Sequence, residues 1–205
     1  MPDDQHPGCP AVTVLPAANR SDEPWRNGGG STRQVAALFG QDGPAWRLSM
    51  ARVESDGPFS VFPGVTRTIL VMDGDEMLLN VDGTEVLLGS EPFTFDGAGT
   101  IRGTLRGSAV TDFNVMVKRG EFNATTERIA PGHSSFRTSA EQWHSPGTIV
   151  VVAPASGARI EVEPLGLDVQ LAAYDAVRID GVTSSLQGTI RSPGSSVLVV
   201  LTPER

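Results

Sequence analysis

A glycine-rich segment near the N-terminus contains the densest group of residues with ligand-binding chemistry. Trp25, Arg26 and Asn27 are followed by three consecutive glycines and then by Ser31 and Thr32. Glycine adopts positive φ and lets the backbone approach other groups closely, so exposed amides at this point could cradle an anion. A phosphate-binding loop is disfavoured, because no lysine follows at the required spacing and no helical pattern succeeds the glycines. The alternative is a tight turn that leads into a strand, with Trp25 as a buried lid.

Polar side chains also lie on strands that are otherwise apolar. Strand alternation puts Arg47 and Ser49 on the face opposite the apolar one, where composition favours solvent and a barrel mouth is the alternative. Arg67 shares its strand face with apolar neighbours, so it needs a negative partner. That partner is either Asp112 or an anionic ligand. Asp112 and Asn114 share one face of a later strand.

The elements that position these residues are short strands. The chain has 23 glycines and 15 prolines, and runs rich in Val, Ile, Leu, Phe and Thr lie between them. No segment shows the long 3.6-residue period of an amphipathic helix. The sequence therefore predicts an all-β sandwich or barrel, with strands at 46–53, 66–72, 77–81, 84–88, 93–95, 113–118, 148–152, 159–162, 169–172, 176–179 and 197–201.

An internal similarity predicts two related β units. The segment that begins at Gly74 resembles the one that begins at Gly157, and the aligned pairs include Gly83/Gly166, Val86/Val169 and Leu88/Leu171. Hairpins with glycine turns also resemble one another through turn chemistry alone. We expect an N-terminal unit at 1–120, a linker or covering arm at 121–147 and a smaller C-terminal unit at 148–205.

Composition narrows the function classes. The net charge of −8 and the pI near 4.8 make a nucleic acid a repulsive partner. The longest apolar run, at 149–153, is far below the ~20 residues of a membrane span, and the first residues lack a secretory pattern. The single Cys9 excludes an internal disulfide, which is consistent with a reducing compartment. We therefore expect a cytoplasmic protein that binds neither membrane nor nucleic acid.

The runs WRNGGGSTRQVA, WRLSMARVESDGPFSVFPGVTRTILVMDG, PFTFDG and DFNVMVKR resemble the signature of the HutD/Ves family. The resemblance covers about Trp25 to Arg119 and is most specific in the glycine triplet and in the segment 57–64. It implies a double-cupin (bicupin) fold and an association with bacterial histidine utilisation. It also implies that a member binds a pathway intermediate such as formylglutamate and restrains the pathway.

The cupin resemblance allows a test for a metal site. Metal-dependent cupins carry two close His, a Glu and a later His around the first hairpin. The stretch 57–74, which would supply the first three ligands, contains no His, and we place His6, His133 and His144 in irregular segments. Ser49 and Ser60 have no His on a neighbouring expected strand and no nucleophile elbow. We therefore expect no metal, no cofactor and no catalytic residues.

The principal hypothesis is a non-enzymatic module that binds a small acidic metabolite. Arg47 or Arg67 would hold a carboxylate, Ser49 and Asn114 would donate hydrogen bonds, and Trp25 would close the mouth. The rival hypotheses are a metal-independent cupin isomerase or hydrolase that uses Asp112, and an interaction protein whose pocket is filled by side chains. A homodimer is compatible with each of them. The expected ligand-binding residues are Trp25, Asn27, Arg47, Ser49, Phe62, Arg67, Asp112 and Asn114.

Overall fold

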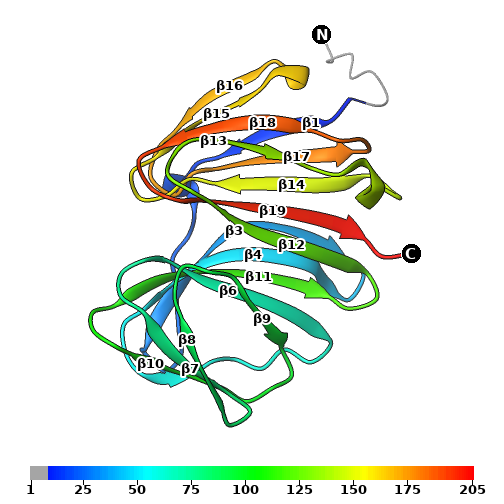
Figure 1. Ribbon diagram of the computed structural model, residues 1–205. Helices are drawn as coiled ribbons and strands as arrows, with labels where there is room; N and C mark the ends of the chain where they lie inside the picture. The colour runs from blue at the N-terminus through cyan, green and yellow to red at the C-terminus, as the bar shows by residue number, and fades with distance from the viewer. Residues whose placement is uncertain (1–8) are drawn as a thin grey trace.

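Short apolar runs between glycine and proline turns form strands throughout the computed structural model, which describes residues 9–205. The strands pair in four antiparallel sheets that make two units, one below the other in Figure 1. The helical elements of the described chain are three single 3-10 turns: η1 (Ala17–Asn19), η2 (Ala140–Gln142) and η3 (Glu163–Leu165). The all-β prediction is confirmed.

The first unit has a six-stranded and a four-stranded sheet. The six-stranded sheet has the order β2 (Glu23–Pro24), β3 (Gly30–Gly40), β4 (Gly43–Val53), β11 (Val110–Lys118), β6 (Val65–Asp73) and β9 (Phe93–Asp96). The four-stranded sheet has the order β5 (Gly57–Pro58), β10 (Ile101–Leu105), β7 (Met77–Val81) and β8 (Thr84–Leu88).

The second unit has a five-stranded and a four-stranded sheet. The five-stranded sheet has the order β1 (Ala11–Leu15), β17 (Ala176–Val182), β14 (Gly147–Val152), β19 (Ser196–Pro203) and β12 (Phe122–Ile129). The four-stranded sheet has the order β13 (Gly132–Arg137), β18 (Gln187–Ser192), β15 (Ala158–Val162) and β16 (Leu167–Leu171).

The internal similarity in the sequence corresponds to equivalent hairpins. Strands β7 and β8 pair in the first unit as β15 and β16 pair in the second, and β10 and β18 lie beside β7 and β15. Gly83 and Gly166, which the alignment matched, both adopt positive φ at the turns of these hairpins. The chain therefore contains two related β units.

Three apolar clusters hold the layers together. One fills the first unit between its two sheets around Ile69 and Leu79, and another fills the second unit around Ile149 and Ile160. The third lies where the six-stranded and five-stranded sheets face each other, because the outward faces of both sheets are apolar. The central strands of these large sheets therefore contribute one face to a unit and the other face to the contact between units.

The segment 121–147 differs from the linker that we expected. It contains β12, which pairs with β19, and β13, which pairs with β18. Strand β1, inside the expected first unit, pairs with β17 in the five-stranded sheet of the second. All three strands lie at sheet edges with mainly exposed side chains, and β12 and β13 also lack the apolar runs that mark buried strands.

No helix of the described residues has the length and apolar character that a membrane crossing requires.

Candidate functional site

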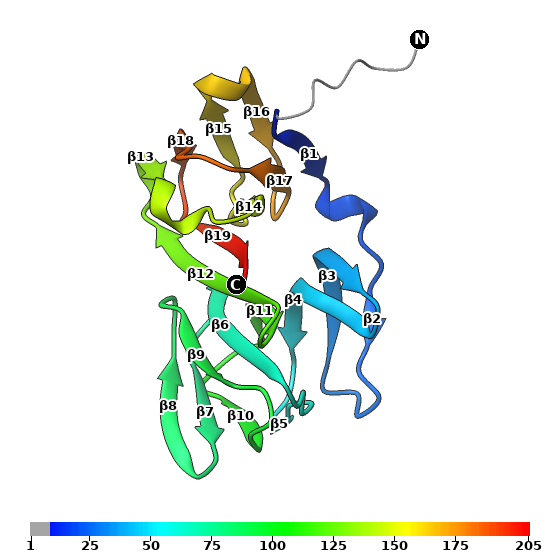
Figure 2. The ribbon, with the colours of Figure 1, turned by 90° about the vertical axis from the view of Figure 1, so that its right-hand side faces the viewer.

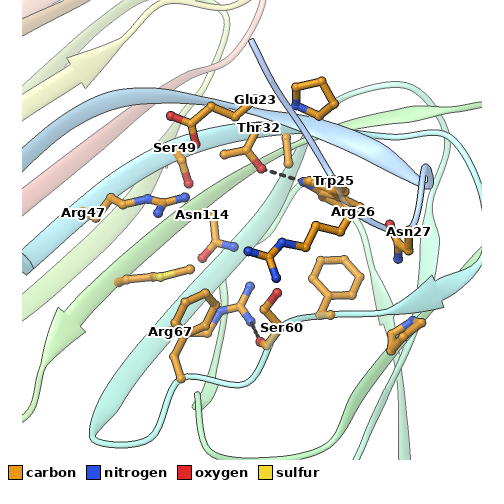
Figure 3. Close-up of a pocket in the computed structure, with 16 residues that line it drawn as sticks. Glu23, Trp25, Arg26, Asn27, Thr32, Arg47, Ser49, Ser60, Arg67 and Asn114 are labelled. Atoms are coloured by element: carbon orange, nitrogen blue, oxygen red, sulfur yellow. Dashed lines mark hydrogen bonds between the residues drawn. The ribbon is translucent and has the colours of Figure 1, made fainter. Parts of the chain in front are cut away.

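A cavity of about 580 Å³ opens into the first unit. Its floor is the inner face of the six-stranded sheet, and β5 with the segment that follows it and the segment before β3 form its walls (Figure 3). The lining residues are Glu23, Pro24, Trp25, Arg26, Asn27, Thr32, Arg47, Ser49, Ala51, Pro58, Phe59, Ser60, Phe62, Arg67, Asn114 and Met116.

Arg67 on β6 is the most buried charge in this wall, with 2% of its surface exposed. Its Nη1 donates to the carbonyl oxygen of Ser60 at 3.2 Å, while its buried Nε has no acceptor among residues 9–205. The rings of Phe59, Phe62 and Phe95 surround the guanidinium, with centroids 5.8, 5.4 and 5.2 Å from Cζ. The aromatic faces stabilise the cation but satisfy none of its N–H groups.

Burial lowers the pKa of Arg67 to about 10, against the favourable charge of Asp112 and together with the repulsion from Arg47. Arg67 therefore remains protonated at neutral pH. Its positive charge is available to a ligand in the cavity.

Strands β4 and β11 add further polar groups to the same floor. Arg47 and Ser49 project from β4 and Asn114 from β11, and Figure 3 shows these side chains gathered near Arg67. Within the described chain, the buried Nε of Arg47 and Oδ1 of Asn114 have no hydrogen-bond partner. Unpaired buried polar atoms are costly, so their concentration at one cavity points to a ligand or water that pairs with them.

The mouth is formed by the segment that precedes β3. The indole Nε1 of Trp25 donates to Oγ1 of Thr32 at 2.7 Å, and its ring packs edge-on against Phe59 with centroids 5.9 Å apart. Arg26 is exposed at this mouth and its guanidinium projects into the cavity (Figure 3). Asn27 lines the cavity beside it.

The glycine triplet is a tight turn that leads into a strand. Gly28 has φ +69°, and its amide donates to the carbonyl of Trp25 at 3.0 Å. The amide of Gly29 donates to Oδ1 of Asn27 at 3.1 Å. These two amides are therefore occupied, which disfavours the interpretation of the triplet as an anion cradle. At Gly30 a Cβ would lie 2.1 Å from the carbonyl oxygen of Arg52, so close approach requires this glycine.

Asp112 shares a face of β11 with Asn114 and Met116 but does not line the cavity. Its side chain is fully buried on β11, and neither carboxylate oxygen has a hydrogen-bond partner among the described residues. Burial raises the pKa of Asp112 to about 7, although the charge of Arg67 and the backbone of Ala51 act in the opposite direction. Asp112 and Arg67 attract each other without forming a direct salt bridge anywhere in the described chain.

The cavity brings together all the expected ligand-binding residues except Asp112. The expectation that the polar face of β4 is solvated was wrong, because Ser49 is only 2% exposed and faces the cavity. Sequence reasoning missed Glu23, Pro24, Arg26, Thr32, Ala51, Pro58, Phe59, Ser60 and Met116. Alternation signalled two of these, since Ala51 follows Ser49 and Met116 follows Asn114 on the same strand faces.

The lining does not suit a metal ion. Its arginine side chains repel a cation, and it contains no His or Cys. Across residues 9–205, no group of three or more His, Cys, Asp and Glu side chains is placed to hold a metal. His133 lies on β13 rather than in an irregular segment, and the ring of His144 contacts Arg205. His6 lies outside the described residues.

Comparison with known proteins identifies a family model, a relative in sequence and a solved structure that agree with one another. The sequence model of the HutD family matches residues 17–197. An uncharacterised 21.2 kDa protein from the hutC 3′ region of Pseudomonas putida is 36% identical over 175 residues, which are 83% of this chain and 87% of that protein. The solved structure of HutD from Pseudomonas fluorescens SBW25 is 30% identical and covers 95% of this chain and 100% of that chain, with TM-score 0.80.

A more distant structure supports the fold alone. The bacterial pirin YhhW from Escherichia coli superposes with TM-score 0.60 at 11% identity, covering 95% of this chain and 100% of that chain. The double-cupin fold that the sequence resemblance implied is therefore confirmed, with open, sandwich-like sheets in both units.

Proposed function

The chain belongs to the HutD family, which links it to histidine utilisation, and we propose that it binds a small acidic metabolite without transforming it. The ligand occupies the cavity of the first unit. Binding then modulates histidine utilisation by changing the state of the protein rather than by consuming the ligand.

The unpaired buried donor of Arg67 is the observation that carries this proposal. Arg67 lines the cavity, is charged and almost fully buried, and its Nε has no acceptor in the described chain. A carboxylate accepts two parallel, charge-assisted hydrogen bonds from an arginine fork. An anionic ligand therefore supplies the partner that the fold leaves out.

The charge of the cavity supports the same ligand class. Arg26, Arg47 and Arg67 line it together with a single acidic residue, Glu23, whereas the whole chain has a net charge of −8. A cleft of one sign with low-dielectric walls concentrates ligands of the opposite sign. The volume of about 580 Å³ falls in the usual range of about 300–1,000 Å³ for small-molecule sites. A dicarboxylate such as formylglutamate can engage two arginines at once.

The rival enzymatic hypothesis lacks a suitably placed acid or base. Asp112, the carboxyl that it would use, does not line the cavity. Glu23 is exposed at the rim, and no His lines the wall. The hypothesis of an interaction protein with a filled pocket is disfavoured by the open volume beside Arg67.

Ligand-induced thermal stabilisation tests the proposal. A ligand that binds the folded state alone stabilises it by about 2.7 kcal/mol at one hundred times its Kd. We expect the Tm to rise with formylglutamate, glutamate or a related dicarboxylate, and far less with an uncharged diamide analogue. NMR of the recovered ligand should show no conversion, and a new product would favour the enzymatic hypothesis instead.

Arginine variants locate the site. Arg67→Ala and Arg47→Ala should each weaken binding by about 10- to 150-fold, the cost of removing a charge-assisted hydrogen bond of about 1.5–3 kcal/mol. Each shift is measured against the Tm of the same variant without ligand, so a loss of intrinsic stability does not mimic lost binding. Arg106→Ala, at an exposed position after β10, is the matched control. Equal shifts in all three variants would show that the anion binds elsewhere.

A further inference from the structure

Among residues 9–205, one edge strand lacks the features that protect the other sheet edges. The four sheets of this described part of the chain have two edges each and so eight edge strands. Proline occurs in the two-residue strands β2 and β5, and charged or histidine residues occur in β8, β9, β12, β13 and β16. Strand β1 has the sequence AVTVL, with neither a charge nor a proline. Natural sheets use charges and prolines to prevent edge-to-edge pairing. The absence of both from β1 marks it as an edge strand available for pairing with a strand of another chain.

The exposed face of β1 continues the core of the second unit. On one side β1 pairs with β17, where Val12 lies opposite Ile179 and Val14 opposite Val177. Both partners are buried in the apolar cluster between the sheets of the second unit. Val12 and Val14 themselves are 37% and 41% exposed. Figure 2 shows β1 at the margin of the second unit, with no strand of the described chain on its outer side.

The sequence of β1 is nearly symmetric about Thr13. When two antiparallel copies pair across a two-fold axis at this residue, Val12 of one copy lies opposite Val14 of the other, and Thr13 lies opposite its own equivalent. Four valines then form one apolar patch on the same face of the joined sheets. Two-fold dimers require such a self-complementary surface, in which the same residues serve both copies.

We propose that β1 pairs with β1 of a second copy of this chain, joining two five-stranded sheets into one continuous sheet across a homodimer. The occupant is a second copy rather than another strand-forming partner because the sequence of β1 is nearly symmetric about Thr13 and therefore matches itself in an antiparallel pair. The contact uses one five-residue strand from each copy, so the dimer is weak and depends on concentration. Each copy carries a net charge of −8, so added salt should strengthen the association by screening the repulsion.

A charge-exchange experiment tests the register. In Val12→Lys/Val14→Lys, lysines oppose lysines across the two-fold axis, and we expect the dimer to weaken by about tenfold or more. In Val12→Glu/Val14→Lys, glutamate of one copy opposes lysine of the other, so association should be largely retained. Leu87→Lys, on the exposed edge strand β8, is the matched control and should leave association unchanged. Sedimentation velocity over a wide concentration range measures all four proteins.

A cross-link at the axis gives a second readout. Opposed residues in an antiparallel pair have Cα atoms about 4.5–5.5 Å apart, within the range that a disulfide bridges. We expect Thr13→Cys, in a Cys9→Ser background, to form a disulfide-linked dimer when oxidised glutathione accepts the two electrons and protons of the thiols. Leu87→Cys in the same background should remain monomeric. The proposal fails if the unmodified protein stays monomeric at every concentration and salt level, or if both double variants weaken association equally.

Discussion

Arg67 and Asp112 form an unusual pair of buried opposite charges. They attract each other, yet each leaves hydrogen-bonding atoms unpaired among residues 9–205. Arg67 lines the cavity, whereas Asp112 lies farther along the same face of β11, beyond the point where the cavity ends. A ligand carboxylate beside Arg67 would therefore compete with Asp112 for the same positive charge.

This arrangement predicts a stability that falls as pH rises. The pKa of Asp112 is raised to about 7 in the folded state by burial, whereas an unfolded aspartate titrates near about 3.9. Between these values the folded state binds a proton that the unfolded state has released. The free energy of unfolding should therefore decrease with rising pH, with a slope of up to about 1.4 kcal/mol per pH unit, and level off above about pH 7.

Denaturant unfolding at several pH values measures this slope. Asp112→Asn removes the titrating group, so its free energy of unfolding should lack the Asp112 contribution between about pH 4 and 7. Asp112→Glu retains an ionisable carboxyl and should retain the slope, even where its packing lowers the overall stability. An identical pH dependence in the unmodified protein and in Asp112→Asn would contradict the prediction.

At the scale of elements, the close approach of β3 and β4 depends on one glycine. Gly30 pairs with Val53, and a Cβ at Gly30 would meet the carbonyl oxygen of Arg52 at 2.1 Å and the ring of Trp25 at 3.2 Å. We expect Gly30→Ala to destabilise the protein by about 1–3 kcal/mol, the usual cost of forcing extra atoms into a packed site. Gly28→Asn is the control, because asparagine tolerates positive φ and no atom lies near this position. Equal Tm losses in the two variants would show that the close approach is not limiting.

The strands differed in how far the sequence could predict them. The strands that were expected were found because alternation and apolar runs are local signals, but β3, β10 and β18 were not expected, although none of them lies at a sheet edge. Every strand range expected from 46 onward corresponds to an observed strand. Strands β12 and β13 were missed because they lie at sheet edges and their exposed faces are polar. Their pairing with β19 and β18 is a long-range property that composition does not encode.

The candidate site, too, depends on long-range contacts that local sequence patterns do not reveal. Alternation correctly placed Arg47 with Ser49, and Asp112 with Asn114, on shared faces. It could not establish that a second layer covers the face of β4, and so it favoured solvent for that face. It also could not show where along β11 the cavity ends, so Asp112 was included although only Asn114 and Met116 reach the space. These boundaries depend on loops that approach from distant parts of the chain.

The whole molecule is joined through the two large sheets. Their facing sides bury Trp46 and Leu48 from the first unit against Val150 and Val199 from the second. Arg178 on β17 crosses this contact, donating to the carbonyl of Ala37 at 3.3 Å and lying 5.0 Å from the ring of Trp46. Because each large sheet supplies core residues on both faces, the units share stabilising contacts.

Hydrogen bonds at the margins of the two large sheets also connect the two units. Arg128 on β12 donates to the carbonyl oxygens of Val71 and Ser90 in the first unit, at 3.2 and 3.1 Å. Arg20, which follows η1, donates to the carbonyl of Tyr174 at 2.8 Å. These arginine side chains therefore connect the two units by donating hydrogen bonds to backbone carbonyl groups.

We therefore expect the two units to unfold in one transition. The chain has three tryptophans, of which Trp25 reports on the first unit, Trp143 on the second and Trp46 on the contact between them. Variants that retain only Trp25 or only Trp143, with phenylalanine at the other two positions, should each show one urea midpoint by fluorescence that coincides with its circular dichroism midpoint.

Leu48→Ala, a truncation at the shared contact, should lower the urea midpoints of both reporters together and reduce the free energy of unfolding by about 2–5 kcal/mol. Leu79→Ala, a truncation inside the first unit, is the comparison, and it too should move both reporters if the contact couples the units. A first-unit reporter that shifts in Leu79→Ala while Trp143 keeps its midpoint would show that the units unfold independently.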